Sequence, residues 1–95
     1  MALTVMWSSR AIDHYDQVLV YLSSVWGKTV VRDFINKVDK KVTSISTHPG
    51  IGRRSEQRAG VRGTVIVAQN VLYYETHEEM IKIQALQNPA QNPFR

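Results

Sequence analysis

The stretch VRGTVIVAQNVLYYETHEEMIKIQALQ, residues 61–87, decides the fold, because runs of β-branched and apolar residues alternate in it with short polar turns. β-Branched and aromatic residues favour strands. Gln69-Asn70 is a tight turn in which Asn tolerates positive φ, and 77–79 forms a second turn. The stretch therefore predicts a meander of three antiparallel strands at residues 61–68, 71–76 and 80–87.

The expected register assigns the meander side chains to two faces. Pairing Ala68 with Val71 and Thr76 with Met80 gives one face that forms the floor of a core. This face carries Ile66, Ala68, Val71, Tyr73, Ile81, Ile83 and Ala85. The other face is expected to stay accessible, and an apolar patch there would mark a site for a protein partner. It carries Val65, Val67, Leu72, Tyr74, Lys82, Gln84 and Leu86.

Upstream of the meander, apolar side chains recur about every 3.6 residues instead of every second residue, which indicates helices. The first helical stripe contains Ile12, Tyr15, Leu19, Leu22 and Trp26, and it ends at Gly27. A second stripe runs to Pro49, so the two helices must fold back as a hairpin. With an extended segment at 3–7, the order is β-α-α-β-β-β. This order predicts an α+β fold with the helix hairpin on one face of a small, mostly antiparallel sheet.

Length and composition narrow the class of protein. The 95 residues, 43% of them apolar, fit one domain over residues 1–95. The chain has no cysteine, and its three histidines lack the spacing of metal ligands, so we expect no metal and no cofactor. It has no apolar run of about 18–20 residues and no secretory leader, which predicts a cytoplasmic protein without a membrane partner. The net charge of +4 favours an acidic partner.

The chain resembles the RelE/ParE superfamily of bacterial toxins from type II toxin–antitoxin systems over nearly its whole length. The resemblance lies in the order and spacing of short pieces: His48-Pro49 after the helix pair, Gly60-Val61-Arg62, Val71-Leu72-Tyr73-Tyr74, Ile81-Lys82-Ile83 and the tail Gln91-Asn92-Pro93. It implies the β-α-α-β-β-β fold and a role in plasmid stabilization. It also implies a cognate antitoxin protein as partner, in a heterotetramer or a larger complex.

Two activities occur in this superfamily. RelE-like toxins are ribosome-dependent mRNA endoribonucleases, whereas ParE-like toxins inhibit DNA gyrase and are not known as nucleases. RelE-like enzymes carry arginines at positions that correspond here to 71–76 and to 87–91, and neither stretch contains Arg or Lys. The arginine of the ParE-like tail is also missing, because Ala90 occupies its place. The sequence therefore favours a ParE-like inhibitor of DNA gyrase, with the ribonuclease, and hence an enzyme, as the alternative.

Candidate site residues follow from charge and from the expected faces. Arg53, Arg54 and Arg58 form a cationic loop that either binds a polyanionic target or is merely solvated. Arg62 either contacts the target or forms a salt bridge with Glu75, Glu78 or Glu79. The remaining target-binding candidates are Tyr74, Lys82 and Arg95. The candidates for binding the antitoxin are Val65, Val67, Leu72 and Leu86, on the face expected to be accessible, and the helix hairpin is the alternative site for the antitoxin segment. No catalytic residue is assigned.

Overall fold

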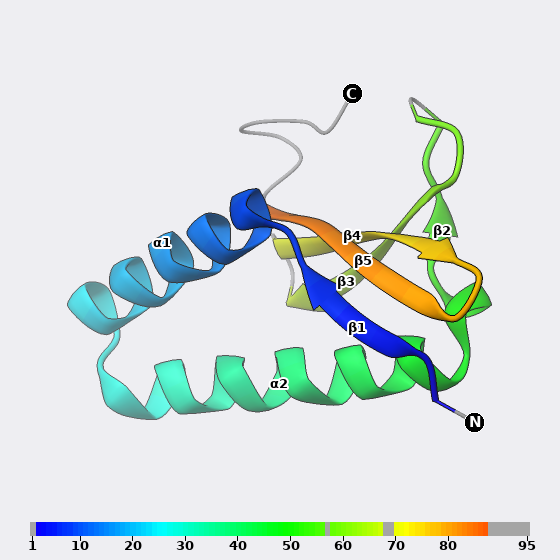
Figure 1. Cartoon of the computed structure of the whole chain (residues 1–95). Helices are drawn as coiled ribbons and strands as arrows, with labels where there is room; N and C mark the ends of the chain where they lie inside the picture. The colour runs from blue at the N-terminus through cyan, green and yellow to red at the C-terminus, as the bar shows by residue number, and fades with distance from the viewer. Residues whose placement is uncertain (1, 57, 68–69, 88–95) are drawn as a thin grey trace.

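A computed structural model describes residues 2–56, 58–67 and 70–87 (Figure 1). The predicted order β-α-α-β-β-β is confirmed, with a short 3₁₀ helix and a two-residue strand added between the helices and the meander. The elements are β1 (Thr4–Trp7), α1 (Ser9–Val25), α2 (Lys28–Thr47), η1 (Pro49–Ile51), β2 (Arg53–Arg54), β3 (Val61–Val67), β4 (Asn70–His77) and β5 (Met80–Gln87).

The ends of the helices follow from local chemistry. The Ser8 hydroxyl oxygen accepts a hydrogen bond from the N–H of Ala11 at 3.0 Å and so caps the start of α1. α1 gives way to α2 at Gly27, whose φ of 91° lies in a region that glycine adopts readily. Figure 1 shows the result, a helix hairpin whose second arm, α2, runs beneath the sheet. In the described part of the chain, neither helix combines the length and apolar character needed to cross a bilayer.

The sheet has the strand order β1-β5-β4-β3-β2. β1 runs parallel to β5, and the other neighbouring strands are antiparallel. The helices contribute Ala11, Phe34, Val38 and Ile45 to the main core, and the sheet contributes Ile66, Leu72, Tyr74, Ile81, Ile83 and Leu86. The mostly antiparallel sheet with the hairpin on one face matches the expectation from the sequence.

The stripe expected on the first helix is only partly correct. Tyr15, Leu19 and Leu22 pack against the main core. Ile12 is 48% exposed and Trp26 is 64% exposed. The buried side of α1 is centred on Ala11, Tyr15, Val18 and Leu22, so Ile12 lies to one side of it, and Trp26 lies beyond the last helical residue.

The expected register of the meander is wrong in both hairpins. Val71 pairs with Val65 instead of Ala68, and Ile83 pairs with Tyr74 instead of Tyr73. Both observed pairings are shifted from the expected ones by an odd number of residues, and an odd shift exchanges the two faces of a strand. Leu72 and Tyr74 therefore lie in the main core, at 0% exposure, whereas Val71 and Tyr73 lie on the opposite face.

A bulge in β5 explains why its two halves face differently. Tyr73 pairs with Ala85 and Tyr74 with Ile83, so Gln84 has no partner of its own on β4. Beyond the bulge Leu86 faces the helices and is 1% exposed, and Ala85 is buried on the other face, the reverse of the expectation. The hydroxyl of Ser8 donates to the carbonyl oxygen of Gln84 at 3.1 Å, which ties the bulge to the start of α1.

Candidate functional site

The side of the sheet turned away from the helices, which we call the open face, carries two rows of cross-strand neighbours. Such neighbours share a face, so the rows can be read from the strand pairing. The first row is Arg53, Gly63, Tyr73 and Ala85. The second row is Val61, Glu75, Lys82 and Met6. The rows come from all five strands of the sheet.

Tyr73 occupies the centre of the open face. Its ring lies against Gly63, where an added Cβ would come within 3.2 Å of the Tyr73 Cε1 atom. Val61 and Ala85 are buried against the same ring, in a small cluster separate from the main core. Burial raises the pKa of Tyr73 above its ordinary value of about 10, so its hydroxyl keeps its proton at neutral pH.

Two of the predicted cations lie on the open face. Arg53 is exposed and stands in the row of Tyr73, at the edge of the sheet. Lys82 is half-buried and pairs with Glu75 in the second row. The face therefore presents a protonated tyrosine with a cation on either side and the Glu75 carboxylate beside Lys82, so Arg53 is the cation on this face that stands apart from a carboxylate in the strand pairing.

On this face Glu75 and His77 form a hydrogen-bonded carboxylate–imidazole pair that the sequence reasoning missed. His77 Nε2 lies 2.9 Å from Glu75 Oε2, and the two side chains are 51% and 20% exposed. Residues i and i+2 of a strand share a face, so the spacing of Glu75 and His77 within β4 was the available signal. A carboxylate beside an imidazole can exchange a proton with a bound ligand.

The other predicted cations lie elsewhere. Arg54 pairs with Arg62, so it shares the helix side of the sheet, and Arg58 is exposed in the loop before β3. Arg95 lies outside the described residues. The cationic loop is therefore not one cluster, because adjacent strand residues such as Arg53 and Arg54 point to opposite faces.

Arg62 forms a structural contact that neither expectation included. Its Nη1 atom donates to the carbonyl oxygens of Gly52, at 2.8 Å, and Gly50, at 3.4 Å. Among the described residues it forms no ion pair, and Glu75 is paired with His77 instead. The expected salt bridge is therefore wrong. Through these hydrogen bonds the guanidinium group of Arg62 holds the turn at 49–52 in position beneath the sheet.

Tyr74 was expected to be accessible and is instead fully buried. Its hydroxyl donates to the carbonyl oxygen of Pro49 at 2.7 Å and accepts from the N–H of Gly52 at 2.9 Å. Burial raises the pKa of Tyr74, while the Gly52 hydrogen bond and the Arg62 charge act against the rise. Tyr74 and Arg62 therefore hold the same turn, and Tyr74 is not available as a surface contact.

The four apolar candidates for binding an antitoxin are likewise divided between the buried core and the exposed face of the sheet. Leu72 and Leu86 are at most 1% exposed, because the register and the bulge turn them towards the helices. Val67 follows an irregularity in β3 and packs against the main core. Val65 is 53% exposed, as expected for an accessible side chain.

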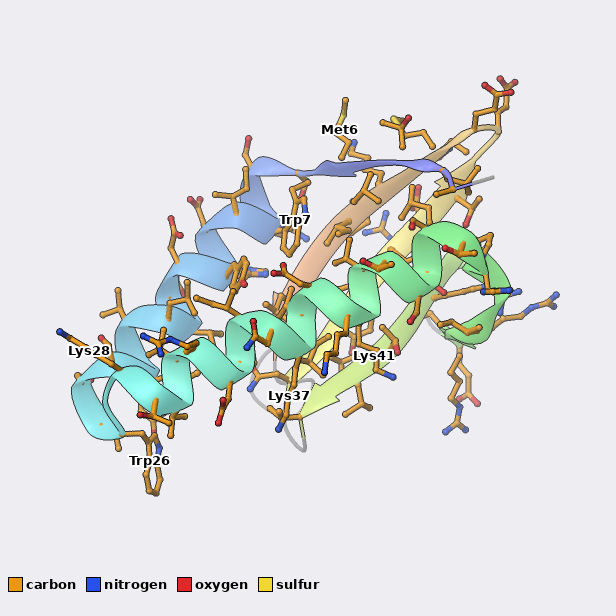
Figure 2. The ribbon with its side chains drawn as sticks, turned by 90° about the horizontal axis from the view of Figure 1, so that it is seen from below. Met6, Trp7, Trp26, Lys28, Lys37 and Lys41 are labelled. Carbon is orange, nitrogen blue, oxygen red and sulfur yellow. The ribbon has the colours of Figure 1, made fainter. Side chains whose placement is uncertain are left out.

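A second group of exposed apolar side chains lies on the helix hairpin. We call it the α1 surface, and it consists of large side chains distributed around the exposed sides of α1 and just after its end. Trp26 is 64% exposed, and Figure 2 shows it pointing away from both helices at the tip of the hairpin. The α1 surface comprises Ile12, Val20, Tyr21, Val25 and Trp26.

Comparisons with known proteins agree with this fold. The family model described as "ParE toxin of type II toxin-antitoxin system, parDE" matches residues 5–93. No curated relative matches the sequence. A structure of the chromosomal ParDE toxin–antitoxin system from P. aeruginosa is 18% identical, with a TM-score of 0.77, and the match covers 92% of this chain and 96% of that one.

Two further solved structures share the fold at low identity. A YoeB/ParE toxin from Agrobacterium tumefaciens is 13% identical, with a TM-score of 0.67 and coverage of 90% of this chain and 98% of that one. The heterotetrameric YoeB–YefM toxin–antitoxin complex from Staphylococcus aureus is 19% identical, with a TM-score of 0.64 and coverage of 92% and 97%.

Proposed function

The chain belongs to the ParE toxin family of type II toxin–antitoxin systems, and we propose that it inhibits DNA gyrase and is neutralised by a cognate antitoxin. The observation that carries the proposal is the family model, which matches residues 5–93. The arrangement of cations supports it. β4 contributes no Arg or Lys to the open face, and Arg62 is engaged with the carbonyl oxygens of Gly50 and Gly52.

The open face is the surface that we assign to the target. Arg53 and Lys82 place positive charge on both sides of Tyr73, and the whole chain carries a net charge of +4. Such a surface attracts an acidic protein region before contact and orients it on binding. Val65 extends the same face with an exposed apolar side chain, which suits a protein target more than bare nucleic acid.

The α1 surface is the site that we assign to the antitoxin. Val20, Tyr21 and Trp26 are each at least 60% exposed, so their apolar side chains are accessible to a partner. Exposed Trp and Tyr are common anchors of protein interfaces. We infer an assembly of toxin and antitoxin chains in which an apolar segment of the antitoxin covers α1. A second segment of the antitoxin then blocks the open face.

A supercoiling assay tests the proposed target. Purified toxin is titrated into DNA gyrase with relaxed plasmid, and we expect supercoiling to fall as toxin increases. Arg53→Glu should relieve the inhibition, whereas Arg54→Glu, on the helix side, should not. Unchanged supercoiling at toxin concentrations that stop growth in cells would exclude gyrase as the target.

The Glu75–His77 pair favours a second candidate, a ribosome-dependent mRNA endoribonuclease. Cleavage through a 2′-hydroxyl needs a base and an acid, and a carboxylate 2.9 Å from an imidazole can supply both. Arg53 and Lys82 would then face the phosphate. Incubation with programmed ribosomes distinguishes the two candidates. Messenger cleavage that His77→Gln abolishes would support the ribonuclease, and intact messenger beside inhibited gyrase would exclude it.

A further inference from the structure

The two edges of the sheet differ in charge. One edge ends in β2, whose residues are Arg53 and Arg54, and charged side chains on an edge strand oppose its pairing with another copy. The other edge is β1, and residues 2–9 contain neither a charged side chain nor a proline. Figure 2 shows β1 along the border of the sheet, with both helices to the same side of it. The edge of β1 therefore lacks the charges that protect the opposite edge.

The backbone groups of Val5 and Trp7 point outward from this edge. The N–H groups of Thr4 and Ser8 donate to carbonyl oxygens of the β4–β5 hairpin, at 3.1 and 2.9 Å, so these two residues face β5. Backbone groups of alternate strand residues point the same way, so those of Val5 and Trp7 point away from β5. The N–H of Leu3 is already bound, at 2.8 Å, by a carbonyl oxygen near the end of α2. Among the described residues no strand lies beyond Val5 and Trp7.

Met6, which lies between these two residues, adds an apolar side chain to the edge. It is 53% exposed, and Figure 2 shows it projecting beyond β1 and away from α2. The strand itself is fixed from the helix side, where Val5 packs against the main core and the ring of Trp7 stacks on Tyr15 with 5.2 Å between the ring centroids. β1 thus presents a fixed backbone and an exposed apolar side chain, the two features on which strand pairing depends.

We propose that β1 pairs antiparallel with β1 of a second copy of this chain. A twofold axis at Met6 sets Val5 of each copy opposite Trp7 of the other, and each such pair exchanges N–H and C=O hydrogen bonds. The two Met6 side chains meet across the axis and cover one another. The two sheets become one continuous sheet. Paired residues share a face, so the two open faces lie on the same side of it.

Charge and symmetry select a second copy as the occupant. The net charge of +4 opposes association of the chain with itself, but pairing at β1 brings no charged side chains of the strands together. A second copy also supplies the same outward groups at symmetry-related positions, as a self-complementary interface requires. β1 has four residues, so the contact is small, and we expect a weak dimer that forms as concentration rises. The proposal does not depend on the gyrase assignment, because it concerns only association of the chain with itself.

Sedimentation equilibrium of the full chain at increasing concentration tests the proposal. We expect the average mass to rise from the 10.8 kDa of one chain towards twice that value. Met6→Lys places a positive charge from each copy at the axis and should weaken association by about tenfold or more, about 1.4 kcal/mol. Val65→Lys is the matched control, because Val65 is also 53% exposed on the open face but lies in β3, away from β1. This variant should associate within about twofold of the parent.

Disulfide formation is an independent test, because the chain contains no cysteine. Residues directly opposite one another in a non-hydrogen-bonded antiparallel pair have Cα atoms about 4.5 Å apart, a distance that a disulfide spans. Pairing raises the effective concentration of the two thiols, so Met6→Cys should form a disulfide-linked dimer about tenfold or more faster than Val65→Cys. Thermal unfolding verifies that the variants fold.

Four results would overturn the proposal. The first is an average mass that stays at 10.8 kDa up to a concentration of about 1 mM. Equal losses in the two lysine variants would reduce the effect to net charge, and equal rates in the two cysteine variants would exclude a contact at Met6. Self-association that Met6→Lys leaves intact and Trp26→Lys removes would place the contact on the α1 surface instead.

Discussion

The side-chain oxygen of Tyr74 accepts a hydrogen bond from the backbone N–H of Gly52 at 2.9 Å, across 22 residues of sequence. The same hydroxyl donates to the carbonyl oxygen of Pro49. One buried phenol in β4 thus fixes both ends of the turn that follows α2. The turn directs β2 to the edge of β3, so Tyr74 determines where Arg53 stands on the open face.

Tyr74→Phe should therefore destabilise the protein without unfolding it. The substitution keeps the ring in the core but leaves the Gly52 N–H and the Pro49 carbonyl without their partner, which costs about 1–3 kcal/mol. Urea unfolding followed by circular dichroism measures the change. Tyr21→Phe is the control, because Tyr21 is 60% exposed. Equal stabilities of the Tyr74→Phe variant and the parent would contradict this role of the hydroxyl.

Gly52 should not tolerate a side chain. A Cβ added at Gly52 would overlap the Tyr74 hydroxyl and come within 2.8 Å of the Tyr74 Cε1 atom, so one of them must move. We expect Gly52→Ala to lower the free energy of unfolding by about 1–3 kcal/mol, the usual cost of overpacking. Gly50→Ala is the matched control two residues away, where an added Cβ meets nothing within 4 Å. A larger loss in Gly50→Ala than in Gly52→Ala would refute the packing argument.

His14 should make stability depend on pH. Its Nδ1 atom accepts the N–H of Leu86 at 3.3 Å, which only the unprotonated nitrogen can do. Burial lowers the pKa of His14, Arg10 lowers it further, and Asp13 partly opposes them. The folded state therefore binds fewer protons than the unfolded state. The stabilisation is present above the ordinary pKa of about 6.5 and is lost as the pH falls through the folded pKa.

The measurement is the urea midpoint at about pH 7.5 and about pH 5.5, above the range in which most carboxylates titrate. The urea midpoint of the parent should be lower at about pH 5.5 than at about pH 7.5. His14→Asn keeps an acceptor oxygen but cannot titrate, so its midpoint should fall less. His48→Asn, at an exposed position after α2, should behave like the parent. If His14→Asn and the parent lose the same stability on acidification, His14 is not the group responsible.

The order of the elements could be predicted from the sequence because it depends on apolar periodicity, which is a local property. Which face of β4 is turned towards the helices could not be predicted. Both faces of that strand carry large apolar residues, Leu72 and Tyr74 on one and Val71 and Tyr73 on the other, so hydrophobicity does not choose between them. The choice is made by the partners of the Tyr74 hydroxyl and by the bulge at Gln84, which are contacts between residues far apart in sequence.

The same limit applies to the candidate site. Arg53 and Lys82 were identified from their charge and Val65 from its expected face, and the structure leaves them accessible or half-buried on one face. Arg62 was misread because its partners are backbone carbonyl oxygens, which no side-chain pattern reveals. The exposure of Ile12 and Trp26 was missed for a related reason. A helical stripe identifies apolar positions, but it does not say which of them the sheet has room to cover.

Arg53 and Arg54 offer the sharpest test of the open face, because two adjacent arginines of one short strand point to opposite sides of the sheet. Charge reversal of either lowers the net charge of the chain equally, so any difference between them comes from position. If the open face binds the target, Arg53→Glu should weaken inhibition of gyrase by about tenfold or more, about 1.4 kcal/mol. Arg54→Glu should remain within about twofold of the parent. Thermal unfolding would verify that both variants fold. A stronger effect from Arg54→Glu would move the target site to the helix side, and equal effects would mean that the target responds to the overall positive charge and not to this face.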